Sequence, residues 1–129
     1  MPPASIPDSV RRFVLGNIPS VPYLEAILLL RADPASHWDA QLTAERLYLR
    51  PQVARELLNQ LAAAGVATPE AQAPGSFRYQ PVSPELATTL DDVAAAYSSN
   101  LVGVTELIHS RIDKRAQQFA DAFRWRKEP

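Results

Sequence analysis

The chain contains no cysteine, which excludes disulfides, thiolate metal sites and a cysteine nucleophile. It also lacks long apolar runs: the longest, Ala26–Leu30, is far shorter than the ~20 residues that span a bilayer. The first residues, MPPASIPDSVRRF, lack the apolar core of a signal peptide. We therefore expect a cytoplasmic protein without membrane contact.

Lysine is missing from the first 110 residues, which hold seven arginines against eleven acidic residues, a net charge of −4. Residues 111–129 hold six basic residues against three acidic ones, a net charge of +3, and the whole chain has −1. This balance excludes a surface that is basic throughout, so any nucleic-acid binding must use a local patch.

Catalytic signatures are absent as well. His37 and His109 are 72 residues apart, and the chain has no HExxH, GxSxG or phosphate-loop sequence. Asp91 and Asp92 are adjacent and face different sides of a helix. We predict no catalytic residue, no metal site and no cofactor.

The apolar residues, 47% of the chain, are enough for one domain with its own core. Near the N-terminus we expect a short helix, Ser9–Leu15, capped by Asp8 and ended by Gly16. A second helix, Val21–Arg31, should bury one apolar face. Trp38 is expected in the core or in the stub of a short strand.

The central segment has the clearest helix signals. Asp39 is a cap for a helix over Ala40–Leu47, and Tyr48-Leu49-Arg50 forms a turn. Pro51 suits the first position of the next helix, which runs to about Ala64 and ends at Gly65. Two short extended segments follow, 66–68 and 77–82, on either side of a loop rich in proline and glycine. They predict a hairpin with a long tip.

A long helix is predicted from Pro84 to Ser110, with Ser83 as its cap and a possible kink at Ser98-Ser99-Asn100. A short terminal helix over about Asp113–Arg124 presents Phe119 and Phe123. The apolar stripe of the long helix consists of Leu86, Leu90, Val93, Tyr97, Leu101, Val104 and Ile108.

The central segment resembles the MarR- and PadR-like bacterial regulators, which are winged helix-turn-helix proteins. Thr43-Ala44-Glu45-Arg46-Leu47 matches their second-helix motif, and Leu61-Ala62-Ala63-Ala64-Gly65-Val66 matches the end of their recognition helix. The resemblance covers residues 42–66 by motif and about 20–110 by element order. It implies a mainly α fold with a small β-hairpin wing, a long C-terminal helix and a short terminal helix. The implied organisation is an N-terminal extension (1–19), a winged-helix domain (20–83) and a helical dimerisation segment (84–129).

Several positions depart from that pattern. Arg50 stands where a serine cap is usual, Thr43 replaces a leucine, and Glu56 occupies a position that often holds a groove-facing arginine. The hairpin tip, 69–76, has no lysine or arginine. Few side chains are therefore left to neutralise phosphates.

The resemblance implies a homodimeric DNA-binding transcriptional regulator that inserts the helix at about 51–64 into the major groove. The candidate contacts to double-stranded DNA are Arg50, Gln52, Arg55, Asn59 and Arg78. The alternative is a winged-helix module that binds a protein and no DNA, in which the polar face of that helix is only solvated.

The stripe of the long helix has two interpretations. It is either a core that packs on the rest of the chain or a dimer seam, to which Phe119 and Phe123 would add. We favour the dimer, because a helix of this length extends beyond so small a domain. The basic and aromatic tail, 119–127, also has two interpretations. In the first it contacts nucleic acid or an acidic protein partner. In the second its phenylalanines pack into the dimer, while its basic residues offset the dipole at the C-terminal end of the helix.

Overall fold

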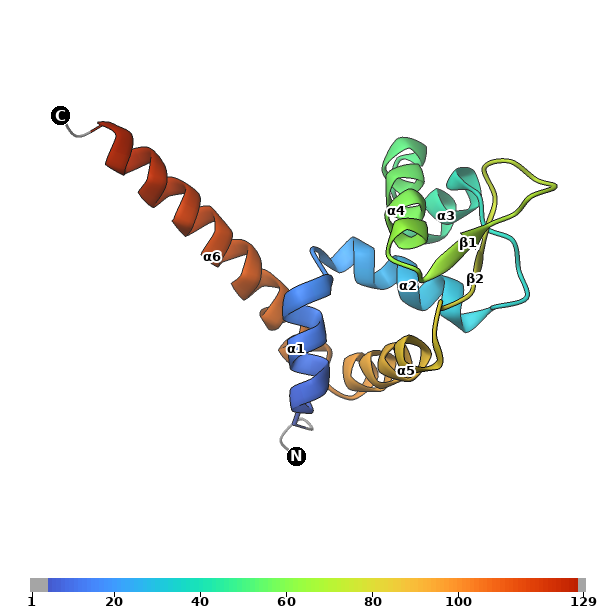
Figure 1. Cartoon of the computed structure of the whole chain (residues 1–129), viewed down its shortest axis with the longest axis horizontal. Coiled ribbons are helices and arrows are strands. Elements are labelled where there is room, and N and C mark those ends of the chain that lie inside the picture. The colour runs from blue at the N-terminus through green and yellow to red at the C-terminus, as the bar shows by residue number, and fades with distance from the viewer. Residues whose placement is uncertain (1–4, 128–129) are drawn as a thin grey trace. The chain divides into compact units, whose positions relative to one another are not determined.

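The computed structural model describes residues 5–127, without the side chains of residues 113, 115 and 121–127. Its described part is mainly helical and has one small antiparallel sheet (Figure 1), which confirms the expected mainly α class with a β-hairpin. The elements in chain order are α1 (Asp8–Asn17), α2 (Val21–Ala32), α3 (Ala40–Leu47), α4 (Pro51–Ala63), β1 (Ala67–Pro69), β2 (Phe77–Tyr79), α5 (Pro84–Ser99) and α6 (Leu101–Lys127).

The chain divides into two compact units. One consists of residues 22–91 and contains α3, α4 and the hairpin. The other combines residues 1–21 with residues 92–129, so the N-terminal helix belongs with the C-terminal one. The division falls within α5.

The core of residues 22–91 is built on α2, where Leu24, Ile27 and Leu30 are buried. Leu28, which the spacing also placed on the apolar face, is only half-buried. α3 and α4 pack against each other, and β1 lies next to α4. From α4 the core receives Ala54, Leu57, Leu58 and Leu61. The buried face of α4 thus consists of small and aliphatic residues, and the polar residues of the helix point to solvent.

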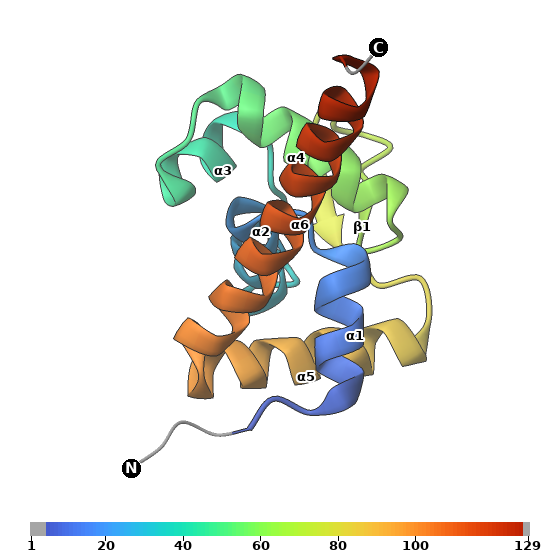
Figure 2. The same cartoon turned by 90° about the vertical axis from the view of Figure 1, so that its left-hand side faces the viewer.

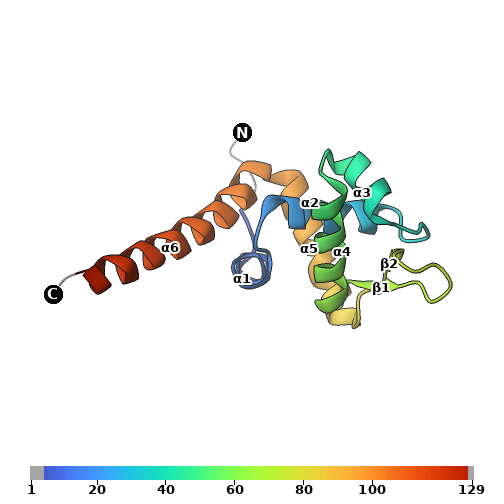
Figure 3. The same cartoon turned by 90° about the horizontal axis from the view of Figure 1, so that it is seen from above.

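The hairpin follows a left-handed helix end at Gly65, whose φ of 78° is one that glycine adopts without steric cost. Its two strands pair antiparallel, with Thr68 opposite Arg78. Trp38, which is buried, pairs with Phe77 through two backbone hydrogen bonds of 2.8 Å, so it is both a core residue and a strand stub, as predicted. The loop between the strands extends away from α4 (Figures 1 and 3).

The first helix differs from the prediction at both ends. It begins at Asp8 itself, after Pro7, and no side chain caps it. It also continues through Gly16 to Asn17, because the side-chain amide of Asn17 donates to the Phe13 carbonyl and satisfies the helix end. Val10 and Val14 are buried, and α1 packs on α6 (Figure 2).

The expected helix from Pro84 to Ser110 is interrupted at Asn100, within the segment 98–100 where a kink was expected, whereas the separate terminal helix over 113–124 is wrong. The chain breaks at Asn100, and α6 then runs uninterrupted from Leu101 to Lys127, about 40 Å at 1.5 Å per residue. The break is capped: Asn100 Oδ1 accepts from the Gly103 amide at 2.9 Å. A Cβ at Gly103 would lie 2.5 Å from the Asn100 side chain, so the glycine leaves room for this cap.

Within the described residues, no single helix is long and apolar enough to cross a membrane; α1 and α2 reach that threshold only when counted together.

Candidate nucleic-acid interface

The turn between α3 and α4 is fixed by backbone hydrogen bonds. Asp39 caps α3 by accepting from the Leu42 amide at 2.8 Å, as the sequence predicts. At the other end of α3, the Tyr48 and Leu49 amides both donate to the Ala44 carbonyl, and Tyr48 takes the left-handed conformation. The chain then enters α4 through Arg50, with Pro51 in the first turn. These contacts fix the conformation of the turn and therefore the direction of α4 relative to α3.

The outward face of α4 gathers three of the predicted DNA contacts. Gln52, Arg55 and Asn59 are exposed and lie three and four residues apart, which puts them on one side of the helix. Glu56 is exposed on the same side. Among the residues that the structure describes, none of these four side chains forms a hydrogen bond or ion pair with another protein group. The face is therefore available to an external partner.

Arg50 extends this face at the beginning of α4. It is exposed and occupies the position before the first helical residue, where serine is usual, but its side chain makes no capping hydrogen bond. The free amides at a helix N-terminus and an arginine beside them are both groups that phosphate accepts from. Arg50 therefore adds an exposed positive charge at the N-terminal end of α4.

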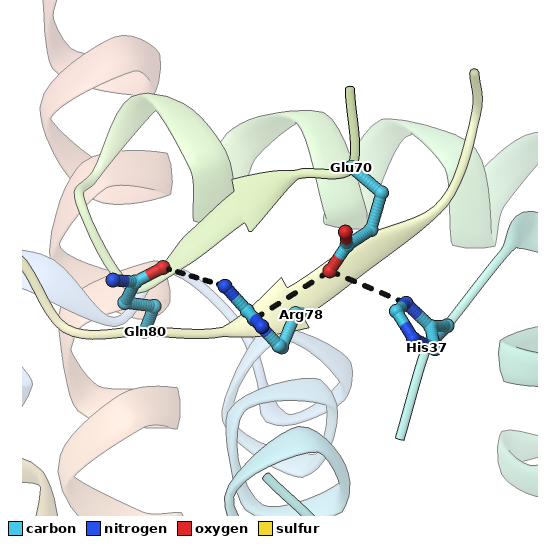
Figure 4. A network of polar contacts seen from close by, with 4 residues as sticks. All are labelled: His37, Glu70, Arg78 and Gln80. Atoms are coloured by element: carbon cyan, nitrogen blue, oxygen red, sulfur yellow. Dashed lines mark hydrogen bonds and ion pairs between the residues drawn. The ribbon is translucent and has the colours of Figure 1, made fainter. Parts of the chain in front are cut away.

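Arg78, the fifth predicted contact, is on β2 and is occupied by protein groups (Figure 4). Its Nε lies 3.5 Å from Glu70 Oε1, and its Nη2 donates to Gln80 Oε1 at 3.4 Å. His37 Nδ1 lies 3.2 Å from the same Glu70 oxygen, on the other side of the carboxylate. The Glu70 side chain is 19% exposed, and its contacts with Arg78 and His37 link the hairpin to the segment before α3.

The electrostatics of residues 22–91 are acidic overall. Five arginines stand against eight aspartates and glutamates, a net charge of −3. The segment from α3 through α4 is the exception, with three arginines against two glutamates, a net charge of +1. Any contact with a polyanion must therefore centre on α4 and the turn that precedes it.

The residues predicted for dimerisation occupy different environments. Leu90, Val93, Val104 and Ile108 are buried within this one chain. Leu86 and Tyr97 are half-buried, Leu101 is 53% exposed, and Phe119 is 70% exposed. The side chain of Phe123 lies outside the described part of the structure, as do the other side chains from residue 121 onwards. Four of the seven stripe residues thus belong to the core of the single chain.

Two features of this surface were not expected from the sequence. The Glu70 carboxylate meets a histidine 33 residues before it, and no local pattern signals such a contact. Tyr48 is 94% exposed with a φ of 56°. The sequence indicated only that Tyr48 lies in a turn. It did not indicate the left-handed conformation, because asparagine or glycine is the usual residue there.

Comparisons with protein-family models, with curated proteins and with solved structures give no match. Within the described part of the chain, no three histidine, aspartate or glutamate side chains are grouped as metal ligands would be.

Proposed function

We propose that this chain is a cytoplasmic DNA-binding transcriptional regulator of the winged helix-turn-helix type, with α4 as its recognition helix and the β1–β2 hairpin as its wing. The observation that carries the proposal is the outward face of α4. Gln52 and Asn59 are amides of the kind that pair with adenine, and Arg55 is of the kind that pairs with guanine. All three are exposed and without protein partners among the described residues.

The order of elements supports the same proposal. α3, a tight turn and α4 are followed by a glycine, a two-stranded antiparallel hairpin and a further helix, as in the family that the sequence resembles. Arg50, in the turn before α4, adds an exposed positive charge next to the proposed recognition helix, and this supports a contact with the flanking phosphates.

The test is salt-dependent binding of the full chain to a fluorescent pool of random-sequence duplexes, followed by anisotropy from about 50 to 200 mM salt. We expect weak binding that falls steeply with salt. Arg50→Ala, which removes the exposed arginine before α4, should reduce the slope of log K against log salt by about 1. Arg12→Ala, which removes an exposed arginine of α1, is the matched control and should leave the slope unchanged. A chain that is folded by circular dichroism but binds no duplex at low salt would refute the proposal.

A second candidate is an interaction module that binds a protein partner and no DNA. Glu56 favours it, because a carboxylate on the face of α4 repels phosphate. The acidic balance of residues 22–91 and the engagement of Arg78 by Glu70 favour it as well. Glu56→Gln separates the two candidates: it should strengthen duplex binding by a regulator and create none in a module of this second kind.

The proposed regulator is a homodimer, and the apolar stripe of α6 supports this. At 100° per residue, Leu101, Val104, Ile108, Ile112 and Phe119 fall on one side of the helix. Val104 and Ile108 are buried within the chain, whereas Ile112 is 43% and Phe119 70% exposed. From His109 to Ala120 no described side chain is buried, and Figure 3 shows α6 running past α1. A second copy of the same helix would cover the exposed part of this stripe.

Sedimentation of the intact chain tests the dimer. Ile112→Lys places a charge in the stripe and should give a monomer at tens of micromolar. Val102→Lys is the matched control, because Val102 is 64% exposed on the same helix but lies about 100° from Leu101. A wild-type chain that sediments as a monomer would refute the dimer. A two-fold dimer would also double the phosphate contacts and bind a palindromic site.

A further inference from the structure

The turn before α4 contains a residue that the fold itself does not favour. Tyr48 has φ 56° and ψ 46°, and it is the only non-glycine residue with positive φ among those described. In this conformation the Cβ of an L-residue crowds the following carbonyl oxygen, whereas glycine has no such contact. The Tyr48 and Leu49 amides bond to the Ala44 carbonyl, so the turn depends on this conformation.

Burial does not offset the strain. The Tyr48 side chain is 94% exposed, so its ring gains almost nothing from packing on the fold. A glycine in its place would form the same turn with less strain and would expose less apolar surface. Residues held in strained backbone conformations are concentrated at functional sites. Tyr48 is therefore a candidate for contact with something outside the chain.

Its neighbours indicate what that partner is. Arg50 and Gln52, two and four residues further on, are exposed at the beginning of α4. When a helix enters the major groove by its N-terminal end, the turn before it faces the phosphates at the edge of the groove. A tyrosine hydroxyl is among the groups that donate to phosphate oxygens. We propose that Tyr48 donates a hydrogen bond from its hydroxyl to the DNA backbone beside α4.

This inference rests on the proposed DNA-binding function and adds a contact of a different kind. An arginine that neutralises a phosphate releases counterions, so its loss flattens the salt dependence. A neutral hydroxyl releases none. The Tyr48 contact should therefore add affinity without adding to the salt slope.

The experiment measures duplex affinity and thermal stability for Tyr48→Phe, Tyr48→Gly and Arg50→Ala. We expect Tyr48→Phe to bind about tenfold more weakly with an unchanged salt slope, as for one hydrogen bond to a charged acceptor. Arg50→Ala should lower the slope by about 1. Tyr48→Gly should bind more weakly yet melt several degrees higher, because the strain is gone. Tyr23→Phe makes the same chemical change on α2, where the side chain is buried, and should bind like wild type.

The contrary results are distinct. Wild-type affinity in both Tyr48 variants would overturn the contact while leaving the DNA-binding function intact. Loss of binding in Tyr48→Gly but not in Tyr48→Phe would mean that the ring matters, and it would overturn the hydrogen bond. A wild-type chain that binds no duplex would overturn the proposed function and this inference together, even if Tyr48→Gly still melts higher.

Discussion

Replacing Gly65 with alanine should destabilise the chain by about 2 kcal/mol, and the structure supplies each contribution. The φ of 78° is strained for any residue with a Cβ, at about 1–2 kcal/mol. A Cβ there would also lie 2.9 Å from Val82 Cγ1. The Val82 side chain is 77% exposed and can rotate, but its amide donates to the Gly65 carbonyl at 2.8 Å and keeps it close. We assign about 1 kcal/mol to this crowding. Alanine also lowers the conformational entropy of the unfolded chain, which offsets the destabilisation by somewhat less than about 1 kcal/mol.

Gly16 provides the control, because the same substitution should there have the opposite sign. Gly16 lies inside α1 without positive φ, and nothing lies within 4 Å of a Cβ added to it. Gly16→Ala should stabilise by about 0.5 kcal/mol through helix propensity. The double variant Gly65→Ala/Val82→Ala should recover the part of the loss that is due to crowding.

Urea denaturation followed by far-ultraviolet circular dichroism measures both changes through the transition midpoint at constant m-value. A Gly65→Ala chain that is as stable as wild type, or that shifts in the same direction as Gly16→Ala, would refute the left-handed helix end and the hairpin geometry that follows from it.

Three further predictions concern single side chains of residues 22–91. Thr43 is fully buried, and its hydroxyl has no hydrogen-bond partner in the described structure. Thr43→Val should therefore raise the free energy of unfolding by about 1 kcal/mol or more. A lower free energy of unfolding in urea denaturation would show instead that the hydroxyl is hydrogen-bonded. Glu70→Gln should release Arg78 from a half-buried ion pair that contributes about 1 kcal/mol. Duplex affinity should therefore rise by up to about fivefold, and the salt slope should steepen. Anisotropy that shows no change in either quantity would exclude Arg78 as a contact. Burial, and after it the nearby Asp91 carboxylate, raises the pKa of Tyr79 above its ordinary value of 10.0. The unfolded chain then loses this proton first, so stability should be fully present below pH 10 and decline as pH rises towards the folded-state pKa. Melting temperatures between about pH 9 and 11 should fall less steeply in Tyr79→Phe, and equal slopes would contradict the shift.

The central helices could be predicted because their signals are local. Asp39, Pro51 and Gly65 each act on backbone groups within a few residues, so their effect does not depend on the rest of the chain. The hairpin was predictable in the same way, because apolar and polar residues alternate in the segment 77–82: in β2 Phe77 is buried and Arg78 is exposed. The candidate contacts on α4 follow from the same periodicity, since burial of one side of a helix exposes the other.

Local signals failed where several of them competed. Gly16 was expected to end α1, but the Asn17 side chain satisfies the last turn and the helix passes through the glycine. At residues 98–100 the sequence indicated poor helix formers, but it did not decide whether the helix would kink or end there. The break depends on Asn100 capping α6, which in turn requires the space that Gly103 leaves.

By itself, then, the sequence determined α3, α4 and the turn between them, the hairpin and the polar face of α4, because caps, turns and periodicity act over a few residues. Only the tertiary structure decided which apolar residues of α5 and α6 are buried and that Glu70 holds Arg78 beside His37. Those contacts join residues far apart in the chain, and their formation depends on how whole elements pack. The left-handed Tyr48 is intermediate: its turn is local, but only the folded backbone reveals that a fully exposed aromatic residue occupies the strained position.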